Sequence, residues 1–268
     1  AVKMLGERAG VALPQTSMSE EDRKERGIRD RLLEINKIAA TYYYRQLRSE
    51  NGKAGLDYLK KRELSDSTIN SFGLGYATQS TGNLYKLLKD KGYDDDILKE
   101  SGLFTYERGI HEKFWNRVIF PIMDINNKVI GFGGRVMGDA KPKYLNSPET
   151  RLFDKSRNLY GLNIARTSRK PNMIICEGYM DVISMHQAGF NQAVASLGTA
   201  LTPGHARLMK RYTDNVLITY DSDEAGVKAA LRAIPILKEA GLSTRVINMR
   251  PYKDPDEFIN CLLYTSPS

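Results

Sequence analysis

The chain has 268 residues, 41% of them hydrophobic and 27% charged, with a formal net charge of +8, which suits a soluble globular protein of one large or two ordinary domains. No apolar run approaches the ~20 residues of a membrane-spanning helix, and the first residues lack the pattern of a signal peptide, so we expect a cytoplasmic protein without a membrane partner. Two cysteines, Cys176 and Cys261, and three scattered histidines exclude a zinc site built from CxxC pairs.

Residues 1–116 are predicted to be mainly helical. A short helical candidate spans residues 2–9. Ser19 then precedes three acidic residues as a helix N-cap, and apolar residues recur at helical spacing to about Arg48. Four shorter helices are expected after it: 54–61, 65–72, 83–90 and 94–100. Nothing in this part has the composition of a catalytic site.

Residues 117–170 are predicted to form a basic region of strands and loops. Residues 101–170 hold thirteen Lys and Arg against six Asp and Glu, and such a block favours polyanions, with a merely solvated basic face as the alternative. Strands are expected at 118–122 and 129–136, followed by a polar loop at 141–150. Three glycines inside the second strand suggest a backbone that another group approaches closely.

Four cations of this region lie at predicted strand ends and loops, where they can reach the phosphates of a nucleotide or a nucleic-acid backbone. They are Arg117, Arg135, Lys143 and Lys155. A single cation in such a place is usually only solvated, but four within forty residues favour phosphate binding.

Residues 171–258 alternate strands with helices, a pattern that predicts a parallel sheet with right-handed crossovers. The expected strands are 173–176, 193–196, 216–220 and 244–248. The expected helices run from about 181 to 188, through His205 and Met209, and from 224 to 239. Ligands of such sheets gather at the carboxyl ends of the strands. Residues 259–268 fit no expected element, and we treat them as a tail.

Acidic residues follow or flank these strands, and carboxylates at strand ends are typical ligands of Mg²⁺. They are Glu177, Asp181, Asp221, Asp223, Asp254 and Asp256. The alternative for residues 221–226 is a helix N-cap with an acidic first turn, and for residues 254–257 it is a plain turn. Acidic residues at several strand ends favour the metal site and hence phosphate chemistry.

Several motifs resemble bacterial DnaG-type primases. Residues 177–182 (EGYMDV), 196–200 (SLGTA) and 221–226 (DSDEAG) are similar to the Toprim domain of that family, and residues 129–135, 142–150 and 159–161 to the preceding part of its polymerase core. The resemblance implies an α/β fold with helical additions. Its Toprim domain has a Rossmann-like parallel sheet and is joined to a mixed α+β N-terminal subdomain.

The resemblance also implies a primer-independent RNA polymerase that uses two Mg²⁺ or Mn²⁺ ions. On it, Asp221 bridges the ions, Glu177 and Asp223 complete the separate sites, and the remaining acidic residues shape the outer cluster. The implied partners are single-stranded DNA template, ribonucleoside triphosphates, the RNA primer and, in the full-length protein, a replicative helicase. Because the chain opens on Ala1 and lacks a zinc ribbon and a helicase-binding domain, we interpret it as a core fragment.

Two other functions remain open from the sequence. One is a different Toprim reaction, cleavage of a nucleic-acid backbone by a topoisomerase or nuclease, which nicking of supercoiled DNA would reveal. The other is a non-catalytic nucleic-acid-binding module, which template binding without any metal-dependent activity would favour.

Overall fold

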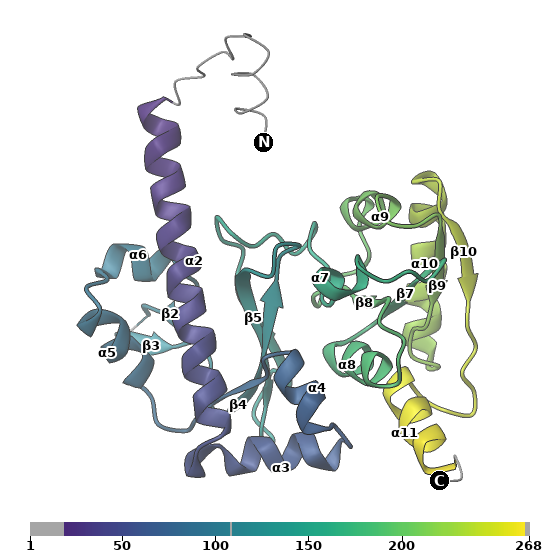
Figure 1. The fold of residues 1–268 in the computed structure, drawn as a ribbon, viewed down its shortest axis with the longest axis horizontal. Coiled ribbons are helices and arrows are strands. Elements are labelled where there is room, and N and C mark those ends of the chain that lie inside the picture. Colours follow the sequence, from purple (N-terminus) through teal and green to yellow (C-terminus); the bar gives the residue numbers. More distant parts are fainter. Residues whose placement is uncertain (1–18, 108, 266–268) are drawn as a thin grey trace, which may run out of the picture.

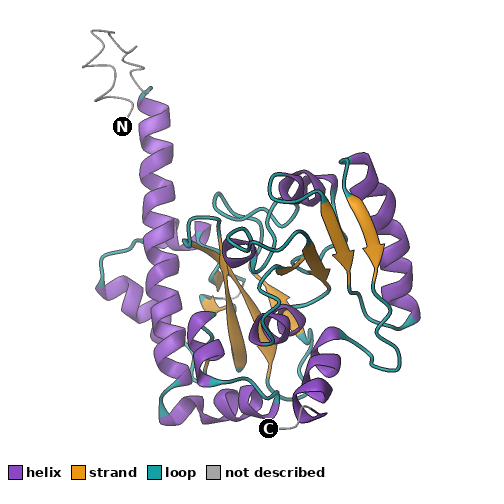
Figure 2. Cartoon of the chain, turned by 45° about the vertical axis from the view of Figure 1, so that its right-hand side comes forward, coloured by secondary structure: helices purple, strands orange, loops and turns teal. Residues whose placement is uncertain are grey.

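The computed structural model describes residues 19–107 and 109–265, and side chains as far as residue 261. The helix expected at residues 2–9 lies outside these ranges. Two groups of strands, each flanked by helices, make up the protein (Figures 1 and 2). No helix within the described ranges is both long and apolar enough to cross a bilayer.

The long helix α2 (Glu20–Leu47) borders the N-terminal half. It begins at a capping box in which the Ser19 hydroxyl accepts a hydrogen bond from the backbone N–H of Asp22, as its N-cap pattern predicts. Short helices follow: η1 (Glu50–Gly52), α3 (Lys53–Lys61), α4 (Asp66–Ser71), α5 (Asn83–Asp90) and α6 (Asp95–Glu100). The four short helices expected here are therefore confirmed.

A four-stranded antiparallel sheet packs against α2, with which its strands share buried side chains. Its order is β1 (Gly75–Ala77), β4 (Arg117–Met123), β5 (Val129–Val136) and β6 (Tyr144–Asn146). A separate hairpin pairs β2 (Phe104–Thr105) with β3 (His111–Glu112). Strands β4 and β5 were expected, but the others are too short for periodicity to predict. Strand β1 comes from the segment expected to be helical, so residues on both sides of position 117 share one sheet.

Aromatic rings of the same chain pack directly against the glycines of β5. A Cβ at Gly133 would overlap the ring of Tyr179, and one at Gly134 would stand 2.8 Å from the ring of Phe114. The close approach expected from these glycines is therefore real, but the approaching groups are this chain's own side chains.

The second sheet is entirely parallel, which confirms the α/β prediction. Its order is β10 (Ser243–Val246), β9 (Asn215–Ile218), β7 (Met173–Cys176) and β8 (Ala193–Ala195). Its helices are α7 (Leu162–Ala165), α8 (Tyr179–Gln187), α9 (Pro203–Lys210), α10 (Glu224–Glu239) and α11 (Pro255–Thr265). Helices α7 and α11 were not expected. Because α11 continues past residue 259, residues 259–265 are helical rather than the tail that we predicted.

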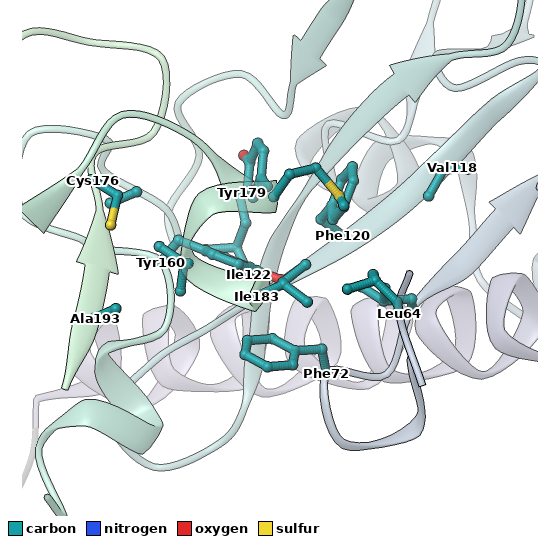
Figure 3. Close-up of a cluster of buried hydrophobic side chains, with 14 of the residues drawn as sticks. Leu64, Phe72, Val118, Phe120, Ile122, Tyr160, Cys176, Tyr179, Ile183 and Ala193 are labelled. Atoms are coloured by element: carbon teal, nitrogen blue, oxygen red, sulfur yellow. The ribbon is translucent and has the colours of Figure 1, made fainter. Parts of the chain in front are cut away.

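One hydrophobic cluster joins the two halves (Figure 3). The ring of Tyr179, at the start of α8, stacks on that of Phe120 from β4 with 4.8 Å between centroids. Its hydroxyl donates to Asn146 Oδ1 at 2.7 Å, and Asn146 Nδ2 donates to the carbonyl of Leu197 at 2.8 Å. These contacts hold the carboxyl edge of the parallel sheet against the end of the antiparallel one.

Candidate active site

The first acidic side chains lie where two adjacent parallel strands end. Glu177 directly follows β7, and Asp221 follows β9 by three residues. The backbone N–H of Asp221 donates to Glu177 Oε1 at 3.1 Å. Asp223 Oδ1 accepts from the N–H of Gly226 at 2.8 Å and caps α10. Asp223 therefore caps a helix, as the alternative for residues 221–226 expected, through one of its two carboxylate oxygens. Neighbouring strand ends bring Glu177 and Asp221 together.

A cleft of about 310 Å³ runs between this edge and the N-terminal half. Its acidic lining consists of Glu177, Asp181, Asp221, Asp254 and Asp256. Its other polar lining includes Arg62, Lys143, Tyr144, Asn146 and Lys253. Carboxylates of the C-terminal half and cations of both halves thus line one space.

The carboxylates raise one another's pKa values. Burial raises the pKa of Asp181 to about 8, with further contributions from the charges of Asp254 and Asp221. Burial, followed by the charges of Glu177 and Asp254, raises the pKa of Asp221 to about 6, while Lys253 opposes the change. Burial also raises the pKa of Glu177. Crowded, half-buried carboxylates with raised pKa values are a site that a cation would stabilise.

The donor set fits Mg²⁺ or Mn²⁺, because both are hard cations that prefer oxygen ligands. Three carboxylates each accept a backbone N–H with one oxygen: Asp181 Oδ2 from Gly178, Glu177 Oε1 from Asp221 and Asp223 Oδ1 from Gly226. Among the described residues, the other oxygen of each carboxylate accepts no backbone hydrogen bond. Within residues 19–107 and 109–265, no three Asp, Glu, His or Cys side chains stand close enough to hold a metal ion.

Asp256 has a structural role that the sequence did not predict. It is 2% exposed, its Oδ2 accepts from Arg62 Nη1 at 2.5 Å, and its Oδ1 accepts from the hydroxyl of Ser184. With both oxygens engaged, Asp256 ties α11 to α8 and to the residue after α3. We propose that this structural role, rather than metal binding, is the function of Asp256. Asp254 Oδ1 accepts from the N–H of Glu257 at 2.8 Å, so this segment begins a helix rather than forming a plain turn.

The four cations predicted to bind phosphate lie in different environments in the structure. Arg117 is 6% exposed and its Nη1 donates to the carbonyls of Gly134 and Pro142, so we propose a structural role for it in place of phosphate binding. The guanidinium of Arg135 lies 4.1 Å from the ring centroid of Tyr58. Lys143 lines the cleft, whereas Lys155 is partly exposed elsewhere and does not.

Sequence reasoning did not single out Arg62, Tyr144 or Lys253 as residues of the cleft. Arg62 lies in the segment predicted to be only supportive, and Tyr144 in a predicted loop that forms β6. Only tertiary packing brings these two to the acidic edge. For Lys253, its position directly before Asp254 was a usable signal.

Comparison with known proteins identifies two family models in the chain. Residues 42–166 match the N-terminal domain of the DNA primase catalytic core, and residues 174–259 match a Toprim-like domain. A DNA primase of Clostridium acetobutylicum is 46% identical over 261 residues, which are 97% of this chain and 43% of that protein. The chain thus spans about two fifths of the length of this curated relative.

Solved structures give the same result. A DnaG primase catalytic domain bound to single-stranded DNA superposes with a TM-score of 0.81 at 37% identity, over 88% of this chain and 76% of that one. The RNA polymerase domain of the Mycobacterium tuberculosis primase superposes with a TM-score of 0.78 at 31% identity, over 88% of this chain and 84% of that one.

Proposed function

The chain belongs to the DnaG-type primase family, and from that premise we propose that it is the polymerase core of a DNA primase. It joins ribonucleoside triphosphates into short RNA on a single-stranded DNA template, without a pre-existing primer. The match of residues 42–166 to a primase domain favours this reaction over other Toprim reactions and over a non-catalytic module.

One observation carries the proposal: a carboxylate edge faces a basic wall across a single cleft. The edge carries Glu177 and Asp221, and the wall carries Arg62 and Lys143. A nucleotidyl transferase must place a metal-bound triphosphate beside a polyanionic strand, and a cleft with both kinds of wall meets that need.

In the reaction, the 3′-oxygen of the first nucleotide forms a bond to the α-phosphorus of the second. The bond from that phosphorus to the oxygen bridging to the β-phosphate breaks, pyrophosphate leaves with the electron pair, and the hydroxyl proton passes to water. Two Mg²⁺ or Mn²⁺ ions would stabilise the attacking and leaving oxygens. Glu177, Asp221 and Asp223 would hold them, and Asp181 and Asp254 would shape the outer part of the acidic cluster.

The basic wall orients the nucleic acid. Lys143, exposed on the loop before β6, offers a point charge to phosphate. Arg135 is partly exposed, and its stacking on Tyr58 fixes its orientation. Lys155 lies outside the cleft and would act on a more distant part of the template.

The wider partners follow from the family. The RNA primer is the product, a replicative helicase would act through a part of the longer protein, and the site of action would be the bacterial replication fork in the cytoplasm. The greater length of the curated relative is consistent with such further parts.

The proposal is tested by incubating the protein with a single-stranded template, ribonucleoside triphosphates and Mg²⁺ and resolving the RNA products on a gel. Wild type should give short RNA, and Asp221→Asn should reduce its yield at least about 100-fold, because the variant loses a metal ligand. Glu224→Gln is the matched control, since Glu224 is exposed and paired with Lys228. Absence of RNA from wild type, or full yield from Asp221→Asn, would refute the proposal, and nicking of supercoiled DNA would favour strand cleavage.

A further inference from the structure

Lys253 is a cation that lines the cleft together with the carboxylates. It immediately precedes Asp254 and lines the same space as Glu177 and Asp221. A cation within the field of the carboxylates that would hold the metal ions is well placed to contact whatever those ions bind.

The backbone of Lys253 is fixed to the loop that carries Asp221. The N–H of Ser222 donates to the Lys253 carbonyl at 2.7 Å, and the Ser222 hydroxyl donates to the carbonyl of Tyr252 at 2.9 Å. The N–H of Lys253 donates to Glu257 Oε2 at 2.5 Å, which anchors the same loop to the first turn of α11. The position of Lys253 relative to Asp221 is therefore set by the main chain.

The ammonium group of Lys253 remains available. Among the described residues, no carboxylate oxygen lies within 4.0 Å of its Nζ, and the side chain is exposed. Arg62 differs, because its guanidinium already pairs with Asp256. Lys253 can thus bind an anionic ligand without breaking an ion pair.

Lys253 also lines a second groove. This groove, of about 600 Å³, is lined by Ser222, Asp223, Arg250, Pro251, Tyr252 and Lys253. Within the described part of the chain, Lys253 is the one residue that lines both this groove and the cleft.

From this placement we infer that Lys253 binds the β- and γ-phosphates of the incoming nucleoside triphosphate and the pyrophosphate that they become. The inference rests on the proposed polymerase reaction, in which the bond between the α-phosphorus and the oxygen bridging to the β-phosphate breaks. Negative charge grows on that oxygen as the bond breaks, and a lysine ammonium beside it stabilises the departing anion.

The test measures equilibrium binding of inorganic pyrophosphate, ATP and AMP by calorimetry, with Mn²⁺ and without template. Lys253→Met should weaken pyrophosphate and ATP binding about tenfold, the effect of one charge-assisted hydrogen bond. AMP binding should change less than about twofold, since AMP lacks the β- and γ-phosphates. Lys253→Arg should restore most of the loss. Lys228→Met, at an exposed lysine on α10, is the matched control.

Three results would overturn the inference. Unchanged pyrophosphate binding by Lys253→Met would exclude the contact. An equal loss for AMP would mean that Lys253 only positions the Asp221 loop. Tighter Mn²⁺ binding with unchanged pyrophosphate binding would mean that it only offsets the carboxylate charge. These readouts are independent of RNA synthesis by wild type, so failure of the proposed function remains distinguishable.

Discussion

Arg62 Nη1 donates to Asp256 Oδ2 at 2.5 Å, across 194 residues of sequence, although the two side chains differ greatly in exposure. The carboxylate is 2% exposed and the arginine side chain 38%. The pair connects the residue after α3 with α11, so it joins the N-terminal half to the last helix and closes one side of the cleft.

The unequal burial predicts an unequal cost of breaking this pair. Arg62→Met leaves a buried carboxylate without its cation and should lower the free energy of unfolding by about 2–3 kcal/mol. Asp256→Asn leaves an arginine that water can hydrate and should cost about 1–2 kcal/mol. Urea unfolding of both variants checks this order.

The control for that experiment is the exposed pair of Lys60 and Asp66. Lys60→Met should change the free energy of unfolding by less than about 0.5 kcal/mol. Equal, small costs for all three variants would show that Asp256 is not a structural residue, and it would then return to the candidate metal ligands.

The close packing around Gly133 leads to a second prediction about stability. A Cβ at this position would overlap the ring of Tyr179, which stacks on Phe120 in the cluster that joins the two halves. Gly133→Ala should therefore cost about 2–3 kcal/mol, as overpacking does. Gly27 is the matched control, because it lies in α2 and a Cβ added there would meet nothing within 4 Å. Gly27→Ala should therefore raise the free energy of unfolding by about 0.5–1 kcal/mol. Thermal unfolding of both variants measures the difference, and a neutral Gly133→Ala would contradict the packing.

Local patterns predicted the elements that are long or strongly periodic. The bounds expected for β5, β7 and α10 agree with the structure, because each combines an apolar pattern with a clear glycine or acidic terminus. Strands β1 and β6 have three residues each, which is too few to show a period. Their pairing depends on β4 and β5, and local sequence does not report such tertiary contacts.

The residues of the candidate site likewise include some that local sequence can predict and some that it cannot. Glu177 and Asp221 could be found from sequence because each follows a predicted parallel strand, and the topology brings such strand ends together. Arg117 and Asp256 carry the charge expected of site residues, yet the structure uses them for internal hydrogen bonds. Burial decided their roles, and burial of a charged residue depends on partners that are distant in sequence.

The raised pKa of Asp181 predicts a pH-dependent stability in metal-free buffer. Its folded pKa of about 8 exceeds the ordinary 3.8, so the folded protein binds more protons than the unfolded chain between these values. Stability should therefore fall as the pH rises from about 4 to about 8. Asp181→Asn keeps a side-chain oxygen for the N–H of Gly178 and removes the charge.

This variant should melt about 2–4 °C above wild type at pH 8, corresponding to about 1 kcal/mol, and the gap should close toward pH 4. Melting curves in a chelator across this pH range provide the measurement. Asp139→Asn, at an exposed aspartate, is the control and should follow wild type. A constant gap at every pH would mean that Asp181 is not protonated more readily in the folded protein.

The position of Lys143 in the cleft leads to a prediction about the salt dependence of template binding. Each lysine that neutralises a phosphate of a single strand adds about 0.7 to the slope of log K against log salt, because a condensed counterion is released. Lys143 lines the cleft and, among the described residues, has no ion-pair partner that would compete with phosphate. Lys143→Gln should therefore weaken binding of a labelled single-stranded oligonucleotide and lower the slope by about 0.7.

Fluorescence anisotropy over a range of KCl concentrations measures this slope, and Lys228→Gln on the outer side of α10 should leave it unchanged.

The Arg117→Gln variant distinguishes a loss of phosphate binding from a loss of structure. Because Arg117 donates to the carbonyls of Gly134 and Pro142, its loss should lower the melting temperature and disturb the loop that presents Lys143. Any loss of template affinity in Arg117→Gln should thus accompany a loss of stability, whereas in Lys143→Gln it should not. A stable Arg117→Gln variant with a reduced salt slope would restore Arg117 to the phosphate-binding residues.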